Sequence, residues 1–334
     1  MGDLILMSPL VENMRVYFPQ AKITLITRED MRAIYQHHPG IHEILTVNRK
    51  DGFRGLWNLT KYLRQSRWDI LFDAHGSLRS VFMRTLISAQ KKFVINKRTL
   101  QRLTLIFFKK NLLPFHYFKD QFSFPLEEFL DTSLKPRPTR LFRSPQERAV
   151  INQRWPFPQQ AKVVGIVPSA QWPGKRWPLE HFQKLIANLQ QHFHIAVFGG
   201  PEDTFCEDLT HSMDPKKVAN FQGKLSLLES FEALSRCQLV VANDTGLMHA
   251  AEAVNTDVVA LLGPTGEQFG FVPYRSQSDF LTQDMWCRPC SKNGQGFCIR
   301  LGRRPCLKEL SVETVLDSVY CYFNKKESHN APLP

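Results

Sequence analysis

The sequence predicts an α/β protein with two domains, each built around a parallel sheet. Short apolar, β-branched runs alternate with helix-like segments along most of the chain, which is the pattern of repeated βα units. The chain has 334 residues, and single cores rarely grow past about 250–300 residues. A proline-rich connector over residues 123–160 interrupts the alternation. We therefore expect an N-terminal domain over 1–154, a second domain over 155–310, and a C-terminal helix with a polar tail over 311–334.

The first domain opens on a predicted helix. Residues 4–18 fit a helix with Pro9 in its first turns, where proline is tolerated. Short apolar or β-branched runs then predict strands at 21–27, 42–47 and 69–74. Such a domain normally begins with a strand, whereas MGDLILMSPL is typical of a turn that leads into a helix.

In the second domain the alternation is more regular. Strands are predicted at 162–169, 194–200, 238–244 and 257–265, and helices at 179–193, 225–237, 245–254 and 312–323. Ligands of open α/β sheets bind at the carboxyl ends of the strands. We therefore expect a ligand site at these strand ends, in a cleft that the two domains face.

Positive charge is concentrated in one segment. The formal net charge is +12, and residues 79–119 contain ten Lys or Arg and no Asp or Glu. Such a balance favours a polyanionic partner, and nucleic acid is disfavoured because no recognition motif accompanies the charge. Within this segment, residues 103–118 interleave apolar side chains with Lys109 and Lys110. That pattern suits an anionic membrane surface or a phosphorylated saccharide, and equally an ordinary helix with one buried face.

No stretch has the length of a membrane span, and the N-terminus has no signal-peptide pattern. From this we expect a cytoplasmic protein.

Two loops of the second domain are suited to phosphate. In residues 240–254 an apolar strand ends at Asp244, and a helix begins at Thr245 and Gly246. Backbone N–H groups and the helix dipole favour an anion there, although Asp244 or Thr245 could simply cap the helix. The loop over 168–178, after the first strand of the domain, is the second candidate.

In that second loop, Ser169 and the backbone could bond phosphate oxygens, and Lys175 or Arg176 could neutralise a diphosphate. The alternative is a tryptophan-anchored surface loop with a solvated basic pair. Two convergent loops of this kind together favour a nucleotide site.

A family resemblance joins these stretches in order along the chain. The stretches that carry it are WDILFDAHGSLRS, GKRWP, FGGPED, FQGKLSLLESFEALSRC, VVANDTGLMHAAEAV and VVALLGPTGEQFGFVPY. Together they resemble the ADP-heptose:lipopolysaccharide heptosyltransferases, glycosyltransferase family 9. The resemblance implies a GT-B architecture, with two Rossmann-like domains facing a cleft. It also implies an ADP-heptose donor on the second domain and a lipopolysaccharide core acceptor on the first.

The resemblance implies roles for the residues of the donor site. Lys175 would bind the diphosphate, and Asp244, Thr245 and Gly246 the phosphates and sugar. Ser169 and Ala170 would add loop contacts, and Glu202 would contact the ribose. The alternative is that Glu202 or Asp203 simply caps the next helix. No metal or other cofactor is expected, because Lys175 and the helix N-terminus hold the departing ADP.

Gly2 and Asp3 fall on the family's Gly-Asp motif, whose Asp is the proposed general base. Asp3 would accept the proton of the acceptor hydroxyl in a single inverting displacement. From local sequence alone it would be a disordered terminal residue. Because this motif follows the family's first strand, we expect that strand to lie before Met1; otherwise the sheet exposes unpaired backbone.

The acceptor side carries less specific signals. His75 replaces the usual Gln of the motif over 68–80, which suggests a different acceptor sugar. Arg79, Arg84 and Arg98 are the candidate acceptor-binding cations. His249 matches a family pattern, and we favour a buried structural histidine over a catalytic one.

A cysteine-rich loop is the remaining feature. Its cysteines are Cys287, Cys290, Cys298 and Cys306, which resemble a loop found in many family members. The spacing permits a zinc site but lacks the usual second close pair, so we expect packing or opportunistic pairing and assign no metal.

The leading hypothesis is an inverting glycosyltransferase that moves heptose from ADP-heptose to a lipopolysaccharide core acceptor, peripheral at the inner face of the cytoplasmic membrane. Two alternatives stay open. One keeps the fold and uses another nucleotide sugar. The other is a catalytically inactive nucleotide-sugar-binding protein of a glycan assembly complex.

Overall fold

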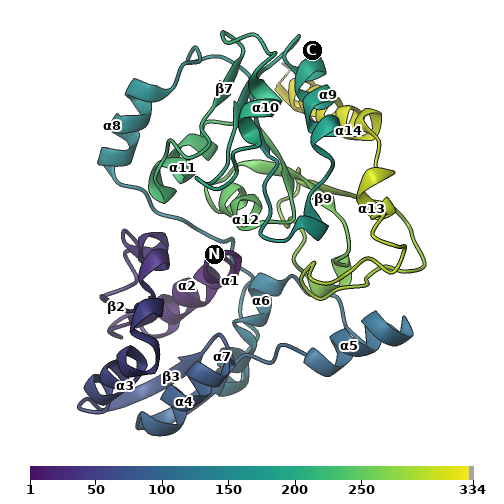
Figure 1. Ribbon diagram of the computed structural model, residues 1–334. Coiled ribbons are helices and arrows are strands. Elements are labelled where there is room, and N and C mark those ends of the chain that lie inside the picture. Colours follow the sequence, from purple (N-terminus) through teal and green to yellow (C-terminus); the bar gives the residue numbers. More distant parts are fainter. Residues whose placement is uncertain (331–334) are drawn as a thin grey trace. The chain divides into compact units, whose positions relative to one another are not determined.

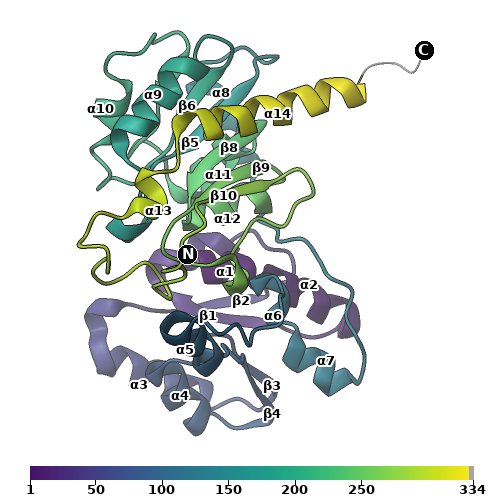
Figure 2. The same ribbon diagram turned by 90° about the vertical axis from the view of Figure 1, so that its right-hand side faces the viewer.

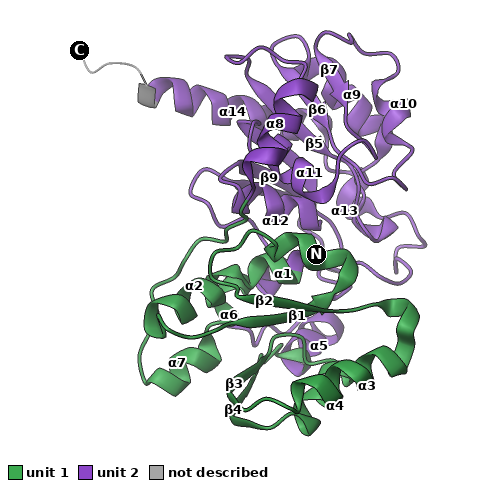
Figure 3. Cartoon of the chain, turned by 90° about the vertical axis from the view of Figure 1, so that its left-hand side faces the viewer, with its two compact units in different colours: residues 1, 3–99, 116–142 green, residues 2, 100–115, 143–334 purple. Residues whose placement is uncertain are grey.

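The computed structural model describes residues 1–330, apart from the side chains of 329 and 330, and forms two compact units. The first unit comprises Met1, 3–99 and 116–142, and the second comprises Gly2, 100–115 and the chain from Arg143 onward (Figure 3). The end of the predicted polar tail, residues 331–334, lies outside the described residues. Helices and strands are numbered in chain order, and Figure 1 labels those for which there is room.

The first unit contains short helices and two pairs of strands. Its helices are α1 (Gly2–Leu6), α2 (Ser8–Tyr17), α3 (Gly52–Leu63), α4 (Leu78–Leu86), α6 (Phe118–Gln121) and α7 (Phe124–Leu130), with 3-10 turns at Glu29–Tyr35 and Arg49–Asp51. Its strands are β1 (Thr24–Arg28), β2 (Glu43–Val47), β3 (Trp68–Asp73) and β4 (Ala89–Val94). Both pairs, β1 with β2 and β3 with β4, are parallel. Among the described residues these pairs form two separate sheets rather than one.

The N-terminal segment is helical, but the single predicted helix over 4–18 is wrong. The chain forms α1 and α2 with Met7 between them, and Pro9 occupies the first turn of α2. Proline lacks the N–H that a continuous helix would require, so a new helix start accommodates it. Asp3 therefore lies in an ordered helix, which the Tyr35 hydroxyl anchors by donating to the Leu4 carbonyl at 2.8 Å.

The second unit is built on one six-stranded sheet. Its strands are β5 (Val163–Val167), β6 (His194–Val197), β7 (Val218–Asn220), β8 (Leu239–Asn243), β9 (Asp257–Leu262) and β10 (Asp279–Thr282). They lie in the order β10-β9-β8-β5-β6-β7, and every pair is parallel. Strand order reverses between β5 and β8, so the loops that leave these two strands diverge. Ligands bind at such switch points.

The second unit also contains helices. They are α5 (Thr99–Phe108), α8 (Pro145–Arg154), α9 (Leu179–Leu189), α10 (Cys206–Thr210), α11 (Leu227–Leu234), α12 (Gly246–Ala253), α13 (Pro305–Lys308) and α14 (Val312–Asn330), with 3-10 turns at Pro173–Lys175 and Glu267–Phe269. Apolar side chains of α9 and α14 pack with Val164, Val241 and Val259 in one buried cluster. Figure 2 shows the ribbons of α9 and α14 next to the strands of this sheet. Every residue of β5, β8 and β9 is buried, which explains their continuous apolar sequences.

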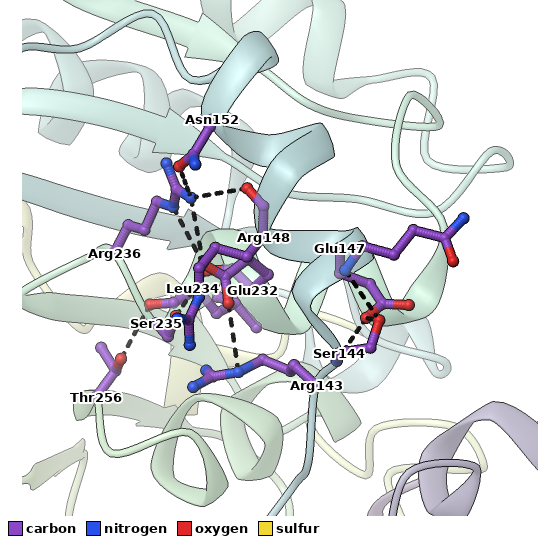
Figure 4. Close-up of polar contacts among 11 residues, drawn as sticks. Arg143, Ser144, Glu147, Arg148, Asn152, Glu232, Leu234, Ser235, Arg236 and Thr256 are labelled. Atoms are coloured by element: carbon purple, nitrogen blue, oxygen red, sulfur yellow. Dashed lines mark hydrogen bonds and ion pairs between the residues drawn. The ribbon is translucent and has the colours of Figure 1, made fainter.

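The second unit begins at Arg143, earlier than the predicted boundary near Trp155, because polar contacts hold α8 to α11 (Figure 4). The Arg143 guanidinium lies 3.4 Å from the Glu232 carboxylate. Arg236 donates to the Asn152 side chain at 2.6 Å. Ser144 caps α8 in a capping box, so the helix starts with its first N–H groups satisfied.

Residues 100–115 also belong to the second unit, although the sequence places them in the first domain. The Lys109 ammonium donates to the carbonyls of Cys287 and Pro289 at 2.8 and 2.7 Å. These long-range bonds join α5 to the cysteine-rich loop, and no local pattern encodes them.

Candidate active site

A buried asparagine ties together the two loops that the sequence singles out. Asn243, at the end of β8, is fully buried. Its side-chain amide donates to the Pro168 carbonyl at 2.7 Å and accepts from the Trp177 N–H at 3.0 Å. Both ends of the 168–178 loop are thus bound to β8. Sequence reasoning missed this positioning role, although a polar residue ending an apolar strand is the signal that could have found it.

Lys175 and Asp244 meet at this edge of the sheet. The Lys175 ammonium lies 2.7 Å from the Asp244 carboxylate, and both side chains are largely buried. The Thr265 hydroxyl donates to the same carboxylate oxygen at 2.8 Å. The structure therefore brings the two predicted residues together and adds Thr265, which the sequence did not single out. Arg288 supports this position by donating to the Thr265 carbonyl at 3.0 Å.

The start of α12 presents backbone N–H groups beside this pair. Thr245 is the N-cap residue in an extended conformation, and within residues 1–330 its side chain makes no capping hydrogen bond. The Asp244 carboxylate is engaged by Lys175 and Thr265. The alternative in which one of these side chains caps the helix is therefore not what the structure shows. A helix start next to an ammonium group suits an anion.

The other predicted donor residues lie along neighbouring loops. Ser169 and Ala170 are buried after β5, and the Ala170 carbonyl accepts from the Arg176 guanidinium at 2.9 Å. Glu202 is exposed. The adjacent Asp203 accepts from the Gly200 N–H at 2.8 Å, so Asp203 forms the turn there.

In the first unit, a buried aspartate shapes the turn after β3. Asp73 accepts from the backbone N–H groups of His75 and Gly76 at 3.0 and 2.8 Å. The Arg84 guanidinium lies 3.6 Å from its other oxygen. Ser77 then caps α4. Asp73 thus fixes the backbone of His75 and draws in Arg84, and the sequence had not assigned it a role.

A lysine of the same unit lies near Asp3. The Lys97 ammonium lies 3.9 Å from the Asp3 carboxylate, which is about half exposed at 49%. His75 is close enough to feel both charges. Partial burial lowers the pKa of His75, and Lys97 lowers it further, while Asp3 and Asp73 oppose the shift. Asp3, Lys97 and His75 therefore form one polar group.

The other two acceptor candidates, Arg79 and Arg98, lie outside this polar group. Arg79 is exposed on α4. The Arg98 guanidinium lies over the Phe124 ring, 5.8 Å from its centroid. The structure thus links His75 and Arg84 to Asp73, whereas Arg98 packs on an aromatic side chain.

All seven cysteines lie within residues 1–330 and carry free thiols. Cys287 and Cys306 are buried, and Cys290 and Cys298 are partly buried. Burial raises the pKa of the Cys306 thiol to about 11. Across residues 1–330, no group of three or more His, Cys, Asp or Glu side chains is arranged to hold a metal ion.

Comparison with known proteins decides the family. The sequence profile of glycosyltransferase family 9 (heptosyltransferase) matches residues 56–297. The chain belongs to glycosyltransferase family 9. The loops that hold Asp73, Lys175 and Asp244 all lie within the matched range, and the chain is a glycosyltransferase, as the sequence predicts.

Individual relatives of this glycosyltransferase are distant but cover most of it. A lipooligosaccharide heptosyltransferase 2 of Haemophilus influenzae is 25% identical over 295 residues, 80% of this chain and 82% of the relative. A solved glycosyl transferase family 9 structure from Veillonella parvula superposes with a TM-score of 0.81 at 21% identity, covering 97% of this chain and 94% of its own. The structure of the Escherichia coli ADP-heptose lipopolysaccharide heptosyltransferase II superposes with a TM-score of 0.74 at 18% identity, covering 98% of this chain and 96% of the Escherichia coli chain. These likenesses confirm the predicted α/β GT-B fold.

Proposed function

We propose that this glycosyltransferase transfers heptose from ADP-heptose to a lipopolysaccharide core acceptor, with inversion at the anomeric carbon. The observation that carries the proposal is the cluster of Lys175, Asp244 and Thr265 beside the start of α12. Such a cluster suits the diphosphate of a nucleotide sugar. The names of the Haemophilus and Escherichia relatives support heptose as the sugar and, for the Escherichia enzyme, ADP-heptose as the donor.

On the donor side, Lys175 would bind the diphosphate and stabilise the charge that develops on departing ADP. The N–H groups at Thr245 and Gly246 would bind the same phosphates, with Asp244 near the sugar. Ser169 and Ala170 would line the phosphate loop. In this proposal Glu202 contacts the ribose. Its side chain is exposed and therefore accessible to a bound nucleotide.

On the acceptor side, Asp3 would act as general base. The oxygen of the acceptor hydroxyl forms a bond to the anomeric carbon while the proton of that hydroxyl passes to the Asp3 carboxylate. In the same displacement the bond between the anomeric carbon and the ADP oxygen breaks. Lys97, 3.9 Å away, would hold that carboxylate in place. His75, Arg79, Arg84 and Arg98 would bind the acceptor, whose phosphorylated sugars suit guanidinium groups.

We also propose that the enzyme works as a peripheral protein at the inner face of the cytoplasmic membrane, with the anionic lipid surface as a partner. The cationic segment over 79–119 supports this. None of the helices within residues 1–330 has the length and hydropathy that crossing a bilayer demands.

The decisive experiment incubates purified enzyme with ADP-heptose and core acceptor, and measures ADP release together with the glycosylated product. Release that requires the acceptor supports the proposal, and its absence overturns it. Thermal shifts with ADP, UDP and GDP test the alternative donors, because only the correct nucleotide should stabilise strongly. An Asp3→Asn variant that binds ADP but has lost transfer supports the base, whereas full transfer would exclude Asp3 from that role.

A further inference from the structure

Helix α5 has two faces of opposite character. Its inner face is held by the second unit, since Arg102 and Leu105 are each only 4% exposed. The Arg102 guanidinium lies over the Phe269 and Phe271 rings, 5.6 and 5.5 Å from their centroids. At the end of the helix, the Lys109 ammonium binds two carbonyls of the cysteine-rich loop. These contacts therefore fix α5 to the second unit.

The outer face of α5 is apolar and exposed. Leu100 is 79% exposed, Phe107 72% and Phe108 78%, with Leu103 at 37%. Leu100, Leu103 and Phe107 follow the i, i+3, i+7 spacing, so they line one side of the helix, opposite Arg102 and Leu105. These four residues, Leu100, Leu103, Phe107 and Phe108, are called the α5 apolar face below.

A contiguous row of exposed phenylalanines and leucines on a helix fixed to its unit marks a surface for a partner that removes them from water. Further exposed apolar side chains follow the helix at Leu112 and Phe115. The surrounding sequence is cationic: Lys110 follows the helix, and no acidic residue occurs between 79 and 119. This combination of an apolar stripe with flanking cations matches an anionic lipid surface.

Charge argues against a second copy of the chain as the partner. A two-fold contact would place the same patch against itself, so the cations of one copy would face those of the other. An anionic bilayer instead supplies both an apolar layer and opposite charge.

We propose that the α5 apolar face inserts into the interface of an anionic bilayer, with the helix lying in the membrane plane and Lys110 among the phosphate headgroups. This proposal rests on the membrane location proposed above and names the element responsible. Arg102 and Lys109 hold the inserted helix to the second unit, so insertion of α5 would bind the whole second unit to the membrane.

The test is co-sedimentation of the full-length protein with vesicles of phosphatidylglycerol and phosphatidylcholine in equal parts. The variant carries Phe107→Asp and Phe108→Asp. The matched control is Phe297→Asp, because Phe297 is also 78% exposed on the second unit but lies outside α5. We expect at least tenfold weaker vesicle binding for the double variant and unchanged binding for the control. A Lys110→Glu variant should weaken binding to these vesicles and leave binding to pure phosphatidylcholine unchanged.

Wild-type binding by a folded double variant would overturn the proposal, as would failure of the wild type to bind either vesicle. Conversion of an oligomer to a monomer by the double variant, with vesicle binding unchanged, would show that a second copy covers this face. Transfer to a detergent-dispersed acceptor separates this proposal from the enzymatic one. The double variant should retain that activity, and an enzyme that binds vesicles but transfers no heptose would contradict only the proposed function.

Discussion

Glu252 lies on α12, the helix whose start forms part of the candidate donor site, and its carboxyl group should make stability depend on pH. The side chain is 1% exposed, and one oxygen accepts from the Tyr274 and Arg275 N–H groups at 2.9 and 3.0 Å. Burial is the largest effect and raises the pKa of Glu252 from 4.5 to about 7, although these two hydrogen bonds oppose it. The folded state therefore holds the proton at a pH where the unfolded state has released it.

The sign of the effect follows from this shift. Well below pH 4.5 both states are protonated, and the contribution of Glu252 to stability is fully present. As pH rises toward 7, the unfolded state ionises more readily, so the free energy of unfolding falls. One pKa unit is worth 1.36 kcal/mol, so the shift from 4.5 to about 7 gives at most about 3 kcal/mol.

Replacing Glu252 by Gln removes the titration and keeps an oxygen for the two backbone N–H groups. We expect urea unfolding to show that the free energy of unfolding of the variant, relative to that of the wild type, is about 2–3 kcal/mol higher at pH 8 than at pH 5. Other titrating groups are common to both proteins and cancel in the difference. The control is Glu180→Gln at an exposed position on α9. Equal differences between variant and wild type at both pH values would refute the reasoning.

Three further predictions concern the candidate site. Lys175→Met should raise the Kd for ADP at least tenfold by calorimetry, because it removes a charge-assisted bond and leaves the nearby carboxylate unneutralised; equal affinity would exclude a phosphate role. Asn243→Ala should lower the free energy of unfolding by about 3 kcal/mol in urea, since two buried backbone groups lose their partners, whereas the exposed Asn188→Ala should change it little. Lys97→Met should lower kcat without changing the affinity for ADP, because Lys97 holds the Asp3 carboxylate. The control, Lys91→Met at an exposed position of β4, should leave kcat unchanged, and a normal kcat for Lys97→Met would remove Lys97 from the mechanism.

Local pattern predicted the four inner strands of the second unit, β5, β6, β8 and β9, but neither edge strand, β7 or β10. The runs over 238–244 and 257–265 became β8 and β9, because strands buried on both faces of a parallel sheet must be apolar throughout. The loop over 168–178 and the helix start at Thr245 then follow from the ends of those strands. The family resemblance, carried by these same stretches, was confirmed.

In the first unit the missed strand has a physical reason. Strand β4 was not predicted, because its sequence AQKKFV carries two exposed lysines and lacks the continuous apolar run of a central strand. The break between α1 and α2 at Met7 was also missed. Whether the expected first strand precedes Met1 stays a prediction.

The sequence by itself determined the α/β class, the order of most strands and helices along the chain, and the family, because periodicity and motif spacing are local properties. Only the tertiary structure decided which side chains meet. Thr265 reaches Asp244, Lys97 reaches Asp3, and Lys109 ties α5 to the cysteine-rich loop across 178 residues. Such contacts depend on strand order and on how loops leave the sheet, and a one-dimensional pattern carries neither.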